Sequence, residues 1–408
     1  MSKLKYLASE PITNGLGEAG VYDLPEWPRY IRTTDIENSR TLRDDVFKSL
    51  PPEVARQALL KPGDLLMTAV GATIGKSYLH RDPNPACYAG YLVRFRPAND
   101  IDARFIAYWA ESKPYWDQVS AGAARSTIDN FSAGKYRNLV LSVPELEEQR
   151  RIADFLDAET VRIDRLIHLR TQQTSLHAQA LMARATQLTG RLALRTGGTS
   201  RQFGVPLRRA IRQTQTGTTP DGLKEPAAIS PEDRIPWYTP AALGKVLSIG
   251  DADKYVDRSE GKIIPRFPAG SILVTGIGES LGKVGFLDHD ATGNQQLTAL
   301  EPNEKSDGRF LAWQLWASQE EIRNWAQFSR VRIINNDALK SFPIHLPPKD
   351  VQVSVSNDLS SQLDDANRIR HQMERVSFLL SERRQALITA AVTGQIDVST
   401  ASGRGIED

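Results

Sequence analysis

The segment Gly63-Asp64-Leu65-Leu66-Met67-Thr68 is a short apolar run that begins at a glycine, and it returns later in the chain as Gly270-Ser271-Ile272-Leu273-Val274-Thr275. Nearly the same spacing aligns Phe105-Ile106-Ala107-Tyr108 with Phe310-Leu311-Ala312-Trp313. Similar blocks that keep their order and spacing over a long period indicate repeated domains. The chain is therefore predicted to contain two diverged copies of one folding unit.

Each copy has the same internal plan. A mixed region comes first, at about residues 3–144 in one copy and 201–348 in the other, and glycine and proline interrupt its short apolar runs. Runs of this kind are typical of strands, and we expect strands near residues 64–68, 91–95 and 271–275. One short helix is expected in each copy, near residues 104–112 and 309–318.

A long helical segment closes each copy, from about residue 144 to 190 and from about residue 350 to 394. Apolar residues recur in both segments at helical spacing, and a glycine follows each, as is typical of a helix end. The predicted apolar stripes consist of Ile152, Leu156, Ile163, Leu166, Ile167, Thr174 and Leu181 in the first helix, and of Leu359, Leu363, Ala366, Ile369, Met373, Val376, Leu380 and Leu387 in the second.

Helices of this length restrict the architecture. A helix of some 40 residues is about 60 Å long, and a stripe of that length cannot be buried on a small globular domain. It needs a partner helix of similar length, which the other copy supplies. We therefore predict an α+β protein in which two mixed α/β domains are separated by two long antiparallel coiled-coil helices. A pseudo-two-fold axis would relate the copies and place their globular domains at opposite ends of the helix pair.

The composition excludes several classes of protein. The 408 residues include 51 basic and 49 acidic side chains, so the net charge is only +2 and any contact with nucleic acid must use local positive charge. The single cysteine, Cys87, excludes a disulfide framework. No apolar stretch approaches the roughly 18 residues that a membrane span needs. These features predict a cytoplasmic protein without membrane contact.

Lys76 and Lys283 each end a glycine-rich turn that follows a predicted strand. In both turns three residues separate the first glycine, Gly71 or Gly278, from the Gly-Lys pair. A nucleoside-triphosphate loop needs four residues there, so the pattern does not predict an NTPase. Each lysine could contact a phosphate as a point charge. A solvated lysine on a simple turn is the alternative.

Polar loops supply the other candidate contacts. Arginine and asparagine can bind guanine and adenine edges through two hydrogen bonds each. The loop Thr216-Gly217-Thr218-Thr219-Pro220, here called the threonine loop, could place its backbone near a phosphate. The candidates are Arg125, Ser126 and Thr127 in the first copy, and Thr218, Thr219, Arg330, Arg332, Asn335 and Asn336 in the second. Solvated side chains and an ordinary turn are the alternatives.

Catalytic patterns are missing from the sequence. The six histidines do not have metal-ligand spacing. No glycine-rich loop follows a predicted strand with the spacing of a dinucleotide-binding fold. We therefore predict a chain without catalytic residues and without a metal site.

Several phrases of this sequence resemble the specificity subunits of type I restriction–modification systems. In the first copy they are Pro28-Arg29-Tyr30-Ile31-Arg32-Thr33-Thr34-Asp35-Ile36 and Val143-Pro144-Glu145-Leu146-Glu147-Glu148-Gln149-Arg150-Arg151-Ile152. In the second they are Gly217-Thr218-Thr219-Pro220, Ile235-Pro236-Trp237 and Thr389-Ala390-Ala391-Val392-Thr393-Gly394. The resemblance covers essentially the whole chain. It departs from the family where Glu148-Gln149 of the first copy becomes Val351-Gln352 in the second.

The resemblance implies that residues 1–144 and 201–348 are target-recognition domains, each reading one half of a bipartite site on double-stranded DNA. Residues 145–200 and 349–408 would form the spacer helices and a tail, and would set the distance between the half-sites. Two modification (methyltransferase) subunits, which bind S-adenosylmethionine and methylate adenine, would dock on the chain. Restriction and translocase subunits, which use ATP and Mg, would join them. The chain itself would bind no cofactor.

Two other interpretations stay open. The chain could be a methyltransferase or nuclease fused to its own recognition domain, but the motifs for S-adenosylmethionine or metal are missing. It could also be a coiled-coil scaffold whose two end domains bind a ligand other than DNA.

Overall fold

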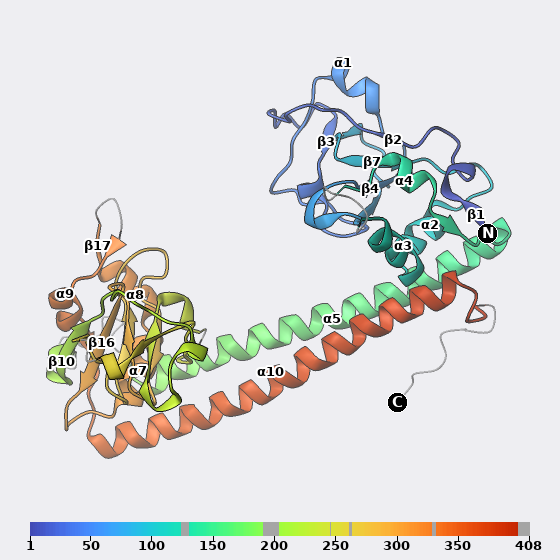
Figure 1. The fold of residues 1–408 in the computed structure, drawn as a ribbon. Coiled ribbons are helices and arrows are strands. Elements are labelled where there is room, and N and C mark those ends of the chain that lie inside the picture. Colours follow the sequence, from blue (N-terminus) through green and yellow to red (C-terminus); the bar gives the residue numbers. More distant parts are fainter. Residues whose placement is uncertain (124–129, 191–203, 245, 261–262, 329–331, 399–408) are drawn as a thin grey trace. The chain divides into compact units, whose positions relative to one another are not determined.

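The computed structural model describes residues 1–123, 130–190, 204–244, 246–260, 263–328 and 332–398 (Figure 1). The chain divides into two compact units. Unit 1 comprises Met1–Thr171 and Glu374–Asp408, and unit 2 comprises Gln172–Met373. Among the described residues, every helix is too short or too polar to cross a lipid bilayer.

A four-stranded antiparallel sheet lies at the centre of unit 1. Its order is β2 (Thr13–Asn14), β7 (Leu92–Phe95), β4 (Leu65–Thr68) and β5 (Ser77–Leu79). Every residue of β4 is buried, which explains why this strand is a continuous apolar run in the sequence. The other elements are β1 (Ser2–Lys3) paired with β8 (Val140–Leu141), β3 (Arg29–Ile31) paired with β6 (Ala86–Tyr88), and the helices α1 (Pro52–Ala55), α2 (Ala103–Trp109), α3 (Lys113–Ala123) and α4 (Ala133–Arg137).

Unit 2 is built on a sheet of the same kind. Its order is β10 (Ile211–Thr216), β16 (Leu297–Pro302), β13 (Ile272–Thr275) and β14 (Val284–Phe286). A second sheet has the order β12 (Lys254–Asp257), β11 (Arg234–Tyr238) and β15 (Thr292–Gly293). The other elements are β9 (Val205–Pro206) paired with β19 (Pro343–Ile344), β17 (Gln327–Phe328) paired with β18 (Arg332–Ile333), and the helices α7 (Gly308–Trp316), α8 (Gln319–Trp325) and α9 (Asn336–Ser341).

Equivalent hydrogen bonds confirm the predicted duplication. The Thr68 amide donates to the Lys76 carbonyl at 2.9 Å, and the Thr275 amide donates to the Lys283 carbonyl at 3.0 Å. The side chains of Asp102 and Asp307 cap the first turns of α2 and α7. The predicted strands and the short helix of each copy are all present.

Two long helices, α5 (Leu146–Leu188, 43 residues) and α10 (Lys349–Val392, 44 residues), carry the apolar stripes. They run antiparallel, because Arg384 of α10 lies 3.1 Å from Asp164 of α5 in unit 1, whereas Asp358 of α10 lies 3.8 Å from Arg184 of α5 in unit 2. Gly190 (φ 74°) has the left-handed conformation typical of a helix end. The predicted fold class and helix ends are confirmed.

The seam between the long helices is narrower than predicted. Ile152, Leu156 and Ile163 are buried, but Leu166 of α5 and Val376 of α10 are each 40% exposed. The prediction was wrong for these two side chains. A straight helix repeats every 3.6 residues, so a stripe that faces one partner at its start drifts away from it along the helix.

Candidate nucleic-acid interface

The two candidate lysines occupy the same turn but make different contacts. Gly75 and Gly282 precede them with φ values of 86° and 84°. The Lys76 ammonium group donates to the Ile36 carbonyl at 2.7 Å. Lys283 is half-buried, and among the described residues its ammonium group has no hydrogen bond or ion pair. Lys283 is therefore the lysine whose charge the fold leaves available.

The threonine loop of unit 2 lies against the turn between β15 and β16. A Cβ atom on Gly217 would come within 2.1 Å of the Gly293 carbonyl oxygen, so only glycine permits this approach. The Thr218 amide donates to the same carbonyl at 2.8 Å. The next residue, Thr219, is exposed and donates its hydroxyl to Oε1 of Gln295 at 2.9 Å. Gly217 therefore allows the threonine loop to lie beside the side-chain amide of Gln295.

The turn between β15 and β16 carries three consecutive amide side chains, Asn294, Gln295 and Gln296, and together with Thr219 we call them the amide edge. Asn294 is buried and holds Gln296 twice, through a bond from its Nδ2 to Oε1 of Gln296 (3.0 Å) and a bond to its Oδ1 from the Gln296 backbone amide (3.1 Å). These amide residues are not among those predicted from the sequence. The signal was the run of three side-chain amides directly before the apolar strand β16.

The predicted polar residues after β17 differ in their exposure and in their hydrogen bonds. Arg332 of β18 is exposed, and its carbonyl accepts a bond from the Gly278 amide at 3.3 Å. Asn335 caps α9 by accepting a bond from the Ala338 amide (2.8 Å). Asn336 donates to the Thr216 hydroxyl at 3.2 Å. The two asparagine side chains thus hold the local fold.

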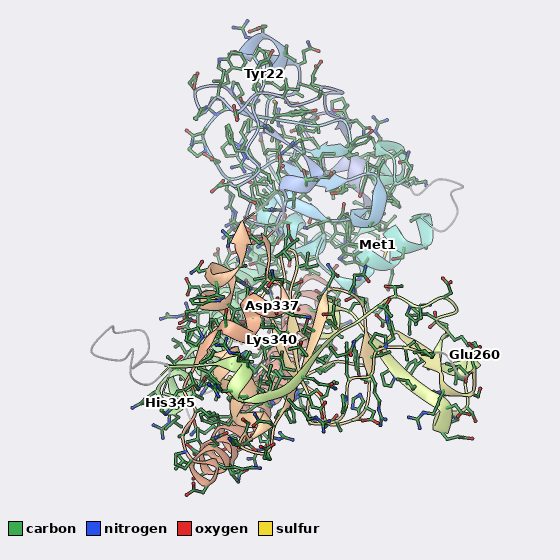
Figure 2. The ribbon with its side chains drawn as sticks, turned by 90° about the vertical axis from the view of Figure 1, so that its left-hand side faces the viewer. Met1, Tyr22, Glu260, Asp337, Lys340 and His345 are labelled. Atoms are coloured by element: carbon green, nitrogen blue, oxygen red, sulfur yellow. The ribbon has the colours of Figure 1, made fainter. Side chains whose placement is uncertain are left out.

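Helix α9 also carries Asp337 and Lys340, which are labelled in Figure 2. The ammonium group of Lys340 lies 4.0 Å from the Asp337 carboxylate, whose side chain is almost fully exposed. Four other predicted contact residues, Arg125, Ser126, Thr127 and Arg330, lie outside the described residues.

Unit 1 has the same backbone arrangement with different side chains. Gly15 meets the Tyr88 carbonyl as Gly217 meets that of Gly293, again at 2.1 Å from an added Cβ. The Tyr91 carbonyl accepts a bond from the Ala69 amide, and the Gln296 carbonyl accepts one from the Gly276 amide. Gly90 and Tyr91 therefore stand where unit 2 has Gln295 and Gln296. Tyr91 is 64% exposed, so this edge is aromatic rather than amide-rich.

A family model described as "Type I restriction modification DNA specificity domain" matches residues 18–173 and again residues 222–374. The chain belongs to this family. Each matched segment contains most of one globular half together with a large part of one long helix, so the specificity domain is the duplicated unit. The family match gives no support to the interpretation as a scaffold for a ligand other than DNA.

Two curated relatives are specificity subunits of type I restriction enzymes. The StySPI subunit of Salmonella potsdam is 26% identical over 137 residues, and the EcoKI subunit of Escherichia coli K12 is 24% identical over 137 residues. Each match covers 33% of this chain and 30% of the relative, so the chain matches less than a third of the length of these proteins.

Solved structures share the fold over nearly the whole chain. A chain from a study titled "Structural basis underlying complex assembly and conformational transition of the type I R-M system" has a TM-score of 0.72 at 14% identity, with 97% of both chains covered. The HsdS subunit from Thermoanaerobacter tengcongensis has a TM-score of 0.51 at 15% identity, with 97% of this chain and 96% of that chain covered. At these identities the likeness concerns the fold.

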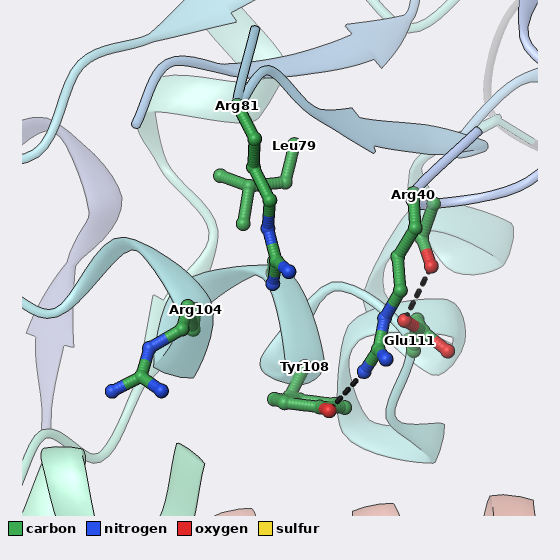
Figure 3. Close-up of a pocket in the computed structure, with 8 residues that line it drawn as sticks. Arg40, Leu79, Arg81, Arg104, Tyr108 and Glu111 are labelled. Atoms are coloured by element: carbon green, nitrogen blue, oxygen red, sulfur yellow. Dashed lines mark hydrogen bonds between the residues drawn. The ribbon is translucent and has the colours of Figure 1, made fainter. Parts of the chain in front are cut away.

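The first specificity domain meets the long helices through a charged junction (Figure 3). Arg40, Arg81, Arg104, Tyr108 and Glu111 line a small pocket there. The guanidinium group of Arg104 lies 3.1 Å from the carboxylate of Asp157 in α5, and Tyr108 donates its hydroxyl to the same carboxylate at 2.8 Å. Burial raises the pKa of Tyr108, so the phenol stays protonated as a donor. These groups neutralise one another, so the pocket is a structural junction.

Both units also pack apolar side chains against the long helices, and in unit 1 these include Ile152 and Leu156 of α5 and Ile388 of α10. Leu181 and Ala185 of α5 belong to one buried cluster with Trp313 and Trp316 of α7. The rings of the two tryptophans are 5.5 Å apart and nearly perpendicular, a favourable aromatic arrangement. Trp313 and Trp316 stand at the positions that Tyr108 and Glu111 occupy in unit 1, so the two junctions differ at these positions.

Within the described residues, His, Cys, Asp and Glu side chains form no group of three that could coordinate a metal ion.

Proposed function

We propose that this chain is the sequence-specific DNA recognition subunit of a type I restriction–modification complex. Residues 1–144 and 201–348 would each read one half of a bipartite site on double-stranded DNA. The observation that carries the proposal is the duplicated specificity domain, in which each copy presents an exposed loop edge built on the same backbone hydrogen bonds. Two specificity domains with similar backbones and different side chains would suit a DNA site whose two halves differ in sequence.

The chemistry of these edges supports contact with a duplex. Lys283 and Arg332 of unit 2 supply positive charge that could meet phosphate, while Thr218 and Thr219 offer exposed polar groups. Phosphate contacts position a protein on DNA, and base-edge contacts give sequence specificity. With a net charge of only +2, the chain would depend on partner subunits for the rest of the electrostatic attraction.

The long helices would serve as the spacer between half-sites and as the docking surface for two modification subunits. In unit 1 they expose large apolar side chains, among them Leu169 of α5 (49% exposed) and Phe378 of α10 (63% exposed). Exposed apolar residues on a paired helix are typical of surfaces that another protein covers. Restriction and translocase subunits would complete the assembly.

The chemical steps would belong to the partner subunits. S-adenosylmethionine would bind the modification subunits, and ATP and Mg the motor subunits, whereas this chain would supply the DNA sequence preference alone. Such a complex would work in the cytoplasm, where the chromosome is accessible. Adenine methylation would require the target base to leave the stack, which is a task for the methyltransferase pocket.

A domain exchange tests the proposal. The complex of this chain with its modification subunits should methylate adenines within one bipartite motif, mapped over a whole genome. Replacing residues 201–348 with the second domain of another family member should change one half of that motif and leave the other half intact. Methylation by the isolated chain, or a change in both halves, would contradict the proposal.

A further inference from the structure

We infer that Gln295 and Gln296 are the base-reading residues of unit 2, and that they select an A·T base pair in its half-site. The inference rests on the proposed function, because it assumes that the amide edge of unit 2 enters a DNA groove. It goes beyond that function by naming the residues and the base chemistry.

Most side-chain amides near the amide edge are already engaged in hydrogen bonds or buried. Asn335 caps α9, Asn336 is bonded to Thr216, and Asn294 is buried beneath Gln296. These three amides already have structural partners. Gln295 is exposed and Gln296 is half-buried, and among the described residues their Nε2 groups have no hydrogen-bond partner.

Both glutamine side chains are held in place by a hydrogen bond to Oε1. Oε1 of Gln295 accepts the Thr219 hydroxyl at 2.9 Å, and Oε1 of Gln296 accepts Nδ2 of Asn294 at 3.0 Å. A carbonyl oxygen has two lone pairs, so each Oε1 can accept a second bond while Nε2 donates one. A side chain that is already oriented loses less rotamer freedom when it binds.

A glutamine amide matches the hydrogen-bonding groups of adenine. In the major groove, adenine offers the N6 amino group as a donor and N7 as an acceptor, and a glutamine amide pairs with both at once. The consecutive positions of Gln295 and Gln296 on one turn suit the reading of one base pair or two neighbouring ones. In unit 1 the equivalent positions are Gly90 and Tyr91, which have no side-chain amide, so the requirement should be confined to one half-site.

The test uses the chain in complex with its modification subunits, and methylated adenines are mapped by sequencing. Substitutions Gln295→Ala and Gln296→Ala, alone and together, should relax one or two base pairs of a single half-site by roughly 10-fold or more. The other half-site should keep its sequence. Gln213→Ala is the matched control, because Gln213 is also an exposed glutamine of unit 2 but lies at the far end of β10, where it binds Glu301.

A second variant changes the specificity rather than removing it. Gln295→Glu keeps an oxygen that can accept the Thr219 hydroxyl, and a carboxylate accepts a bond from N4 of cytosine. This variant should therefore shift the preference at that base pair from A·T towards C·G. Because Gln295 is exposed, its thermal unfolding should match that of the wild-type chain.

Three outcomes would overturn the inference. One is a double alanine variant that keeps the complete wild-type motif, and another is an equal loss of specificity in both half-sites. The third is a relaxed base pair that was G·C in the wild-type motif. A wild-type complex that methylates without a bipartite motif would overturn the proposed function itself, and this result would be seen before either glutamine is changed.

Discussion

Gln149 and Gln352 occupy equivalent positions near the starts of α5 and α10, and each fastens its helix to the loop before the short helix of its own unit. Oε1 of Gln149 accepts the Asp102 amide at 2.9 Å, and Oε1 of Gln352 accepts the Asp307 amide at 2.9 Å. Each Nε2 donates to two backbone carbonyls, and both side chains are buried. The preceding residue is Glu148 in one copy and Val351 in the other, and the glutamine makes the same hydrogen bonds in both.

We predict that Gln149→Ala lowers the free energy of unfolding of unit 1 by about 1–3 kcal/mol, because it removes a buried side chain and leaves the partly buried Asp102 amide without its acceptor. Denaturant unfolding followed by circular dichroism would measure the loss. Gln57→Ala, at an exposed glutamine of the same unit, should change the value by less than about 0.5 kcal/mol. Equal stability of the two variants would contradict the prediction.

The charged junction of unit 1 should depend on salt. The Arg384 guanidinium lies 2.7 Å from the Glu111 carboxylate, with the side chains only 19% and 15% exposed. A double-mutant cycle with Arg384→Ala and Glu111→Ala should give a coupling energy of about 1–2 kcal/mol that weakens as salt is added. The exposed pair Lys113–Asp117, which is 2.8 Å apart, is the matched control and should couple by less than about 0.5 kcal/mol.

His80 should make the stability of unit 1 sensitive to acid. Its ring is buried, and neither nitrogen has a hydrogen-bond partner among the described residues. Burial lowers its pKa below 6.5, although the nearby carboxylates of Asp64 and Asp82 oppose the shift. The unfolded chain therefore takes up a proton at a higher pH than the folded chain. Stability is complete above about pH 6.5 and falls as the pH drops towards the lowered pKa.

Unfolding free energies measured between pH 7.5 and pH 5 would show this loss. His80→Leu should remove this part of the acid sensitivity, whereas His168→Leu, at an exposed position on α5, should keep it. A His80→Leu variant with the pH profile of the wild-type chain would refute the assignment.

The spacer role predicts a change in site geometry when the helices are lengthened. One heptad inserted at matching points of α5 and α10 adds about 10 Å to the pair. Methylation mapping should then show a longer gap between unchanged half-sites, or no recognition of the native spacing. Replacing the same heptad without lengthening the helices is the control and should preserve the native gap. An unchanged gap after insertion would count against the spacer role.

Local signals in the sequence were enough to predict the repeat, the strands and the long helices. The run Gly63 to Thr68 and its counterpart are buried strands whose apolar character is continuous, and such runs are visible without any tertiary information. The helix ends could also be predicted from the sequence, because Gly190 and Gly394 adopt the left-handed conformation that glycine permits. The prediction was wrong for Leu166 and Val376, since helical periodicity alone does not say where the apolar stripe turns away from the partner helix.

The contact residues were harder to predict, because residue type does not reveal whether a side chain is already occupied. The sequence does not show that the Asn335 side chain caps α9, nor that the side chain of Gln295 is exposed. Lys76 and Lys283 looked alike in their turns, and only the fold showed that one of them is bonded to a carbonyl.

The sequence by itself determined the duplicated architecture and the family, because periodic burial, helix ends and a repeated order of motifs are written in neighbouring residues. Only the tertiary structure decided which polar groups remain available on each loop edge. It also showed that the junction of unit 1 contains the ion pair of Arg384 and Glu111, which are 273 positions apart along the chain. Hydrogen-bond partners that are so distant in sequence are brought together by packing, and local patterns carry no record of them.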